Sequence, residues 1–325
     1  MRKKMMITLL VLAASVFVSN GAFAAWTQAK GHSYNQLTLS YYETKQKTST
    51  ILRDGDDQVT SLNSGIHRIN SAKYISTKVS YYGEYGITDK LTAIVSGGWD
   101  WVRSNDNLTY AGESGPSGIG DIILGLRQKI SDNIGGGALM SVQVDVKVPE
   151  AYEYRSPTTH QSLGDGQYDT SVILQIGKGF AKGYAILKTG YKYRFENDQL
   201  GAATFKPSDQ FLFSVNGGYS ATPKFSIRGI LNYNQAIGNA EVSEEMEQAF
   251  VPYGNKDQYD DVLVIKDSLN LEQNNLSAGL DLVYSITSKI QTVASYTTDL
   301  VGIGDLRTRD GALGKTYSLT LVYKH

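Results

Sequence analysis

Ionisable side chains recur at alternating positions in segments whose other residues are mostly apolar or small. Because successive side chains of a β-strand point to opposite faces, this spacing predicts that the charged residues share one face of their strands. Six are acidic and eight are basic, and we expect opposite charges to pair across strands, since an unpaired charge in a partly dehydrated interior costs several kcal/mol. The candidate lumen-lining residues are Lys78, Glu84, Asp100, Asp121, Arg127, Lys129, Asp145, Lys147, Asp169, Lys188, Lys192, Arg194, Arg228 and Asp281.

Two kinds of chemistry fit a charged interior of this kind. Charged side chains along a pore orient a polar or anionic solute, and the small excess of basic residues predicts a mildly cation-lined passage. Alternatively, the same side chains form a polar plug that fills a narrow interior. Both interpretations remain open from the sequence.

Catalytic chemistry has little support. Hydrolases need a general base such as His beside a Ser or a carboxylate. The chain has four His residues, and His160 could meet Asp56 or Asp261 in neighbouring loops. Nothing in the local sequence supports that pairing, so we expect a protein that is not an enzyme and has no catalytic residue.

Metal, cofactor and nucleic-acid sites are not indicated either. The chain has no Cys, which excludes disulfides and thiolate metal sites. The segment from Asp54 to Asp57 lacks the spacing of a calcium-binding EF-hand loop. The glycines at Gly118 and Gly120 precede no helical pattern that would bind phosphate. Since no basic patch is interleaved with aromatic residues, we expect no metal, no cofactor and no nucleic-acid partner.

The first residues predict export. Arg2, Lys3 and Lys4 precede an apolar run from Met5 to Val18, and Ala22-Phe23-Ala24 has the small-x-small pattern of a signal-peptidase site. The alternative, a membrane anchor, needs about 20 apolar residues, which is longer than this run. We therefore expect residues 1–24 to be a signal peptide and residues 25–325 to form the mature protein.

The elements that position the charged residues are predicted to be long β-strands. Between Gly136 and Pro149, apolar residues from Ala138 to Val148 occupy every second position. About eleven residues suffice for a tilted strand to cross the hydrocarbon layer of a bilayer, and the same pattern can be read in enough further segments to make about 12 strands. We expect an all-β fold, a single transmembrane antiparallel up-and-down β-barrel with apolar residues facing lipid and polar residues facing a lumen.

The connections between these segments alternate in length. Short turns are expected near residues 88, 132, 182, 223 and 288, and long polar loops at 43–71, 103–117, 149–167, 196–209, 235–274 and 299–315. Short periplasmic turns, longer extracellular loops and an even strand number are typical of bacterial outer-membrane barrels. The pattern therefore predicts a protein of the bacterial outer membrane with both termini in the periplasm.

Aromatic residues fall into two bands in the same register, as expected for girdles at the two membrane interfaces. The band on the long-loop side comprises Tyr41, Trp99, Trp101, Tyr193, Phe195, Phe211, Tyr233, Tyr296 and Tyr317. The band on the short-turn side comprises Tyr85, Tyr219, Phe225, Tyr284 and Tyr323.

The long loop at 235–274 is strongly acidic, with nine acidic residues against two basic ones. Val242, Met246, Ala249 and Phe250 have helical spacing, which predicts a short amphipathic helix over the barrel mouth. Three roles stay open: the helix gates the pore, the carboxylates gather divalent cations, or the segment is a solvated loop.

Two short motifs carry a family resemblance. Residues 117–125 read Ser-Gly-Ile-Gly-Asp-Ile-Ile-Leu-Gly, and Gly164-Asp165-Gly166 precedes the sixth expected strand. With these motifs the chain resembles the outer-membrane barrel family associated with meta-pathway phenol degradation, and residues 25–31 resemble the start of a related group of barrels. The resemblance implies an outer-membrane transport protein and supplies no catalytic or binding residue.

These observations predict a porin-like outer-membrane channel that passes small solutes passively through a polar lumen. The alternative is a non-conducting structural barrel that acts through its extracellular loops, in adhesion or as an accessory in glycan export. The expected partners are outer-membrane lipid and lipopolysaccharide, the barrel-assembly machinery, and a small-molecule solute that the sequence does not identify.

Overall fold

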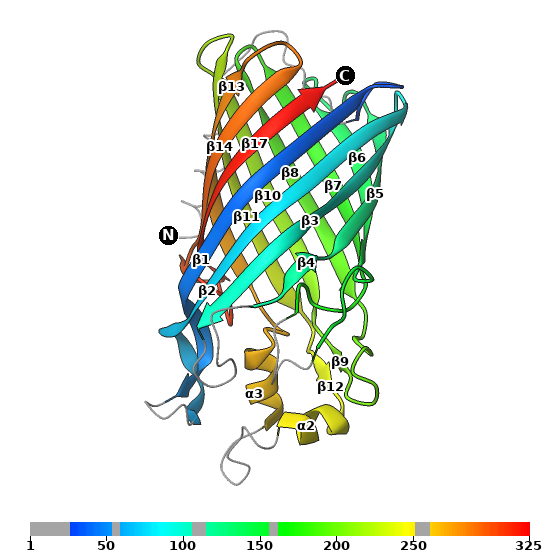
Figure 1. The fold of residues 1–325 in the computed structure, drawn as a ribbon. Helices are drawn as coiled ribbons and strands as arrows, with labels where there is room; N and C mark the ends of the chain where they lie inside the picture. The colour runs from blue at the N-terminus through cyan, green and yellow to red at the C-terminus, as the bar shows by residue number, and fades with distance from the viewer. Residues whose placement is uncertain (1–26, 54–58, 106–114, 156–161, 251–260) are drawn as a thin grey trace.

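The fold is a closed antiparallel β-barrel (Figure 1). The computed structural model describes residues 27–53, 59–105, 115–155, 162–250 and 261–325. Within these residues, twelve long strands each pair with the next along the chain, and the last pairs with the first. They are β1 (Ser33–Arg53), β2 (Val59–Thr88), β3 (Leu91–Asn105), β5 (Ile122–Ser131), β6 (Leu139–Val148), β7 (Asp169–Phe180), β8 (Gly183–Arg194), β10 (Asp209–Ser220), β11 (Phe225–Ile237), β13 (Asn275–Ser285), β14 (Ile290–Asp299) and β17 (Lys315–Lys324). The prediction of a 12-stranded all-β barrel is confirmed.

Short turns and long connections lie at opposite ends of the barrel, as predicted. The turns after β2, β5, β7, β10 and β13 lie at the same end as the C-terminus (Figure 1). The long connections at the other end contain β4 (Ser117–Ile119), β9 (Phe205–Lys206), β12 (Glu241–Val242), α2 (Glu244–Phe250), α3 (Asp261–Ser268), β15 (Gly302–Ile303) and β16 (Leu306–Arg307). No helix in the described part of the chain is long and apolar enough to cross a membrane.

The outer wall of the barrel is apolar because alternation turns every second side chain outward. On β6, Val144 and Val146 are 41% and 37% exposed, whereas Ser141 and Gln143 on the opposite face are 0% and 9% exposed. Exposed apolar side chains occur on the outer face of each of the twelve long strands. A continuous apolar band of this extent is suited to lipid, and closing the sheet satisfies the backbone groups that lipid cannot.

Aromatic residues mark both edges of this band. Trp99 and Trp101 are 44% and 45% exposed near the long connections, and Tyr219 and Tyr284 are 54% and 48% exposed near the short turns. Tyr233 departs from the predicted girdle, because it faces outward but is only 3% exposed. The connection between β15 and β16 covers it.

The predicted polar loop at 43–71 is wrong for most of its length. β1 continues to Arg53 and β2 begins at Val59, and the two strands pair as far as these residues, with irregular register after Thr44 and Ser49. We call this extension, residues 44–53 and 59–74, the β1–β2 arm. Alternation does not reveal it because a strand beyond the bilayer needs no apolar face. Its backbone hydrogen bonds maintain the strand pairing instead.

The predicted helix in the acidic loop is present as α2. The Met246 N–H donates to the Ser243 hydroxyl at 3.2 Å, so Ser243 caps the helix. Met246 is 1% exposed and packs with Tyr154 and Leu271 in a small core beyond the barrel. Val242 was expected on the same helix but lies in β12, because the helix begins after the capping serine.

The β1–β2 arm holds an extracellular cap, which we define as α3 together with residues 309–313. The Thr48 N–H donates to the Gly311 carbonyl at 2.9 Å, and the Leu313 N–H donates to the Gln46 carbonyl at 2.8 Å. Lys47 forms an ion pair with Asp267 of α3 at 2.8 Å. The first strand therefore fixes both the helix and the chain that leads into the last strand.

Candidate functional site on the inner wall of the barrel

The lumen-lining candidates lie opposite the exposed apolar side chains. Thirteen of the fourteen are in long strands, and Asp121 lies just before β5. The cross-strand register sets several opposite charges face to face. The directly opposed pairs are Lys78 with Asp100, Lys147 with Asp169, Asp169 with Arg194, and Arg228 with Asp281.

A buried belt of polar side chains crosses the inner wall from β2 to β7. Arg127 pairs with Glu84 at 2.9 Å, and both side chains are 8% exposed. Arg127 also donates from Nε to the Gln143 amide oxygen at 2.8 Å, and Gln175 donates to the same oxygen at 2.8 Å. The Tyr82 hydroxyl donates to Glu84 and accepts from Arg127. The polar groups of this belt therefore satisfy one another, which offsets the cost of burying them.

A second charged cluster lies nearer the long connections. The Lys147 ammonium is 3.6 Å from Asp121, 3.2 Å from Asp165 and 3.0 Å from Asp169. Arg194 joins it at 3.3 Å from Asp165 and 3.7 Å from Asp169. Asp165 is missing from the predicted set because it lies in a connection, where alternation gives no orientation. The motif Gly164-Asp165-Gly166 is the sequence signal that could have identified it.

Tyr152 supports this cluster from the connection after β6. Its hydroxyl donates to Asp121 at 2.6 Å and accepts from the Gly166 N–H at 2.9 Å. Gly166 has a φ of 77°, which favours glycine at this position. Burial and the hydrogen bond to Asp121 raise the pKa of Tyr152 well above its ordinary value, so the hydroxyl keeps its proton at neutral pH.

The other candidates have different surroundings. Lys129 pairs with Asp132 of the neighbouring turn at 2.9 Å and not with a residue of the next strand. Asp145 accepts a hydrogen bond from Gln143 at 2.7 Å. Lys188 and Lys192 form no ion pair and no hydrogen bond with any residue that the structure describes. The structure thus brings most predicted charges into direct contact, while these two lysines lie near the charged groups without a direct partner among the described residues.

The segment before β1 lies at the short-turn mouth of the barrel, a feature that the sequence does not reveal. The Gln28 N–H donates to the Thr92 hydroxyl at 2.8 Å, and its side-chain amide donates to Glu84 at 2.6 Å. Thr92 and Glu84 belong to the inner face and are 0% and 8% exposed. A Cβ atom on Gly86 would lie 2.0 Å from the Ala29 carbonyl oxygen. This N-terminal segment, residues 27–31, therefore narrows the mouth.

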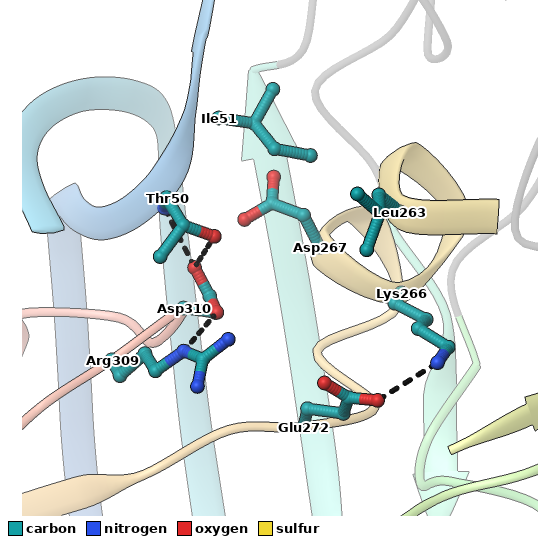
Figure 2. A pocket seen from close by; sticks show the side chains of 8 residues that line it. All are labelled: Thr50, Ile51, Leu263, Lys266, Asp267, Glu272, Arg309 and Asp310. Carbon is teal, nitrogen blue, oxygen red and sulfur yellow. Dashed lines mark hydrogen bonds and ion pairs between the residues drawn. The ribbon is translucent and has the colours of Figure 1, made fainter. Parts of the chain in front are cut away.

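Figure 2 shows a small pocket in the extracellular cap. Its volume is about 20 Å³, room for about one water molecule. Asp310 accepts hydrogen bonds from the Thr50 N–H at 2.8 Å, from the Thr50 hydroxyl at 3.0 Å and from Arg309 at 3.1 Å (Figure 2). Glu272, from the acidic loop, pairs with Lys266 at 2.9 Å. These carboxylates hold the cap together, so the interpretation of a merely solvated loop is wrong for Glu272.

Some predicted features fall outside the described residues. They are the signal peptide at 1–24, the loop from Asp54 to Asp57, His160, and the side chains of Ala249 and Phe250. Among the residues that are described, no group of three or more His, Asp or Glu side chains is placed to hold a metal ion.

One family model, described as "Putative MetA-pathway of phenol degradation", matches residues 57–262. No curated protein matches the chain. The COG4313 outer membrane channel from Pseudomonas putida F1 is 15% identical and superposes with a TM-score of 0.65, covering 94% of this chain and 100% of that one. This likeness shows the fold.

Two further solved structures are less similar. The Pseudomonas putida toluene transporter TodX is 12% identical with a TM-score of 0.40, covering 94% of this chain and 92% of that one. The NanC porin is 9% identical with a TM-score of 0.45, covering 88% and 100%. Neither likeness is close enough to support an argument about function.

The closed barrel, its lipid-facing band and its aromatic girdles make the protein an integral barrel of the bacterial outer membrane. The expected family resemblance is confirmed by the family model, which matches more than half of the 325 residues. The chain therefore belongs to the MetA-pathway phenol-degradation family of proteins.

Proposed function

We propose that the protein is an outer-membrane channel through which small solutes pass passively. The observation that carries the proposal is the contrast between the two faces of one closed wall. On β5, Leu124 and Leu126 face outward and are 51% and 52% exposed, while Arg127 faces inward into a polar network. If the inward side chains served only to fill the interior, apolar side chains in place of the polar network would make the barrel equally stable.

The extent of burial along the inner wall supports the same proposal. Ile173 of β7 and Leu212 of β10 face inward, yet both are only partly buried. In a closed barrel, the exposed part of an inward side chain faces the lumen. The inner wall is therefore not packed solid at these two residues.

Single-channel recording of the purified protein in planar bilayers tests the proposal. We expect discrete conductance steps that are smaller than those of a 16-stranded porin, since fewer strands enclose a narrower lumen. Circular dichroism and heat-modifiable electrophoretic mobility show whether the barrel is folded. A folded barrel with no conductance steps would overturn the proposal.

One observation favours a second candidate function, a non-conducting surface barrel. The belt of Glu84, Arg127 and Gln143 lies on the inner wall, and Gln28 of the N-terminal segment binds Glu84 there. Both features take up space in the lumen near the short-turn mouth. In that case the extracellular loops carry the function, in adhesion or as an accessory in glycan export. Solute uptake unchanged by gene deletion, with adhesion or surface glycan lost on removal of residues 235–274, would favour this candidate.

We infer that the protein reaches the membrane through a cleaved signal peptide at residues 1–24, inserts through the barrel-assembly machinery, and contacts lipopolysaccharide in the outer leaflet. Sequencing of the mature protein should begin at Ala25. The proposed channel needs no cofactor and no catalytic residue. Hydrolysis of phospholipid or peptide by the purified barrel would contradict this part of the proposal.

A further inference from the structure

Two lysines on the inner face of β8 have carboxylates nearby, Glu84 and Asp145 for Lys188 and Asp165 and Asp169 for Lys192, but none within ion-pair distance among the described residues. Lys188 and Lys192 are partly buried, and neither forms an ion pair or hydrogen bond with a residue that the structure describes. Their directly opposite neighbours are uncharged: Gln175 and Ser214 for Lys188, and Ser171 and Gln210 for Lys192. The hydrogen-bond donors of the two ammonium groups are therefore left to water or to a ligand.

This arrangement differs from that of other cations on the inner wall. Lys78, Lys147 and Arg228 each lie directly opposite an aspartate on the next strand. An unpaired ammonium at membrane depth costs several kcal/mol unless it is hydrated or bound to an anion. At the other three cations, an aspartate of the protein offsets this cost. At Lys188 and Lys192, a bound anion would offset it.

The wall between the two lysines is apolar. Gly190 lies midway between them on the inner face, and its direct neighbours across the sheet are Ile173 and Leu212. Both aliphatic side chains are partly exposed toward the lumen. A Cβ at Gly190 would lie 2.6 Å from the Val172 carbonyl oxygen, so a larger residue is disfavoured there and the space between the lysines stays open.

We propose that Lys192 and Lys188 are two successive binding positions for a small organic anion, a monocarboxylate with a compact apolar body. The inference rests on the proposed channel function and names its solute class. The two Cα atoms are about 13 Å apart along an extended strand, so each lysine holds the carboxylate in turn. The apolar body rests on Ile173 and Leu212 as the solute moves between the two positions.

The apolar contact, and not the surrounding charge, distinguishes an organic anion from inorganic phosphate at this site. Asp145 of β6 lies on the same inner wall, and Ser171 of β7 lies between it and Lys192 of β8. Asp169 lies two residues from Ser171, on the same face of β7. These carboxylates repel a phosphate dianion about twice as strongly as a carboxylate, but the lysines also attract it about twice as strongly, because both energies scale with the charge. Only the organic anion adds a contact with Ile173 and Leu212.

Equilibrium binding of benzoate to the purified barrel in detergent tests the site without requiring conductance. Benzamide, a neutral molecule of the same shape, and inorganic phosphate serve as comparison ligands. We expect benzoate to bind about tenfold more tightly than benzamide, as a charge-assisted hydrogen bond predicts. Binding of phosphate in preference to benzoate, or equal binding of benzoate and benzamide, would overturn the inference.

Variants assign the site to the two lysines. The double variant Lys188→Gln and Lys192→Gln should lose the preference for benzoate, and the corresponding double Arg variant should keep it. Lys178→Gln is the matched control, because Lys178 lies on the outer face of the neighbouring β7. A benzoate preference that survives the double Gln variant in a folded barrel contradicts the assignment.

Single-channel recording separates this inference from the proposed function. We expect added benzoate to reduce the KCl current of the wild-type channel at lower concentration than benzamide does. Conductance without any benzoate binding would remove the inference and leave the channel intact. Benzoate binding to a folded barrel without conductance would keep the site and remove the channel.

Discussion

The Tyr233 hydroxyl donates a hydrogen bond to the Asp305 carbonyl at 2.8 Å, on the outside of the barrel. This contact fastens the β15–β16 hairpin against the outer wall at the level of the aromatic girdle. At the hairpin tip, Ile303 is 86% exposed. The hairpin therefore buries one girdle tyrosine and presents a new apolar side chain in its place.

We expect Tyr233→Phe to loosen this hairpin. The variant keeps the ring but loses one hydrogen bond, which is worth about 1 kcal/mol. Hydrogen exchange measured by mass spectrometry should show faster exchange in residues 302–307, with the barrel strands unchanged. Tyr219→Phe is the control, because Tyr219 is 54% exposed and should have no such effect. Equal exchange in both variants would show that apolar contacts alone hold the hairpin.

The buried pair of Glu84 and Arg127 should behave as a unit. Replacing Glu84 with Gln, or Arg127 with Met, should each destabilise the barrel by about 3–5 kcal/mol, since either change leaves a polar or charged group without its partner. The double variant should be less destabilised than the sum of the two single variants. Denaturant-induced unfolding in detergent or lipid measures all three. Strict additivity would mean that the two side chains are not energetically coupled.

Gly86→Ala should displace the N-terminal segment. The added Cβ would lie 2.0 Å from the Ala29 carbonyl oxygen, and a main-chain atom must move to relieve that contact. If the segment limits the passage, single-channel conductance should rise, and residues 27–31 should become sensitive to protease. Gly229→Ala is the control, because its Cβ would meet nothing within 4 Å. Segment release with unchanged conductance would place the constriction elsewhere.

The extracellular cap should respond to pH through Asp310. Burial raises the pKa of this carboxyl above its ordinary value of about 3.9. The folded cap therefore takes up a proton more readily than the unfolded chain does. The cap gains stability as pH falls through the folded-state pKa toward the ordinary value, and that gain is absent above the folded-state pKa.

Asp310→Asn tests this pH dependence. Asparagine tolerates the φ of 49° at this position and keeps an oxygen to accept from the Thr50 N–H. The Thr50 amide, corrected for intrinsic exchange rates, should become better protected on acidification in the wild-type protein and should change little in the variant. Loss of protection on acidification would mean that the charge-assisted contact with Arg309 outweighs the cost of burial.

The membrane-spanning part of the fold can be predicted from the sequence because every strand that crosses the lipid must alternate apolar and polar side chains. Val144 and Val146 illustrate this rule, and the number of strands and the order of turns follow from it. Beyond the lipid that constraint ends. The β1–β2 arm, the placement of Val242 in β12 and the hidden Tyr233 are all decided by contacts outside the bilayer, which leave no periodic signal.

The same limit applies to the candidate site, where alternation predicts only the residues that lie in membrane-spanning strands. Lys147 and Asp169 are recognisable because both lie in alternating strands and face each other. Asp165 contacts the same ammonium from a connection, and Gln28 contacts Glu84 from ahead of the first strand. Neither segment crosses the membrane as a strand, so no alternation indicates which way their side chains point.

The way the β1–β2 arm holds the cap bears on the order of assembly. Residues of the first strand bind Gly311 and Leu313 just before the last strand begins, and Lys47 of the arm also binds α3. The two ends of the polypeptide must therefore meet before the surface structure can take its final form. A complete cap at the cell surface therefore indicates that the ring of strands has closed.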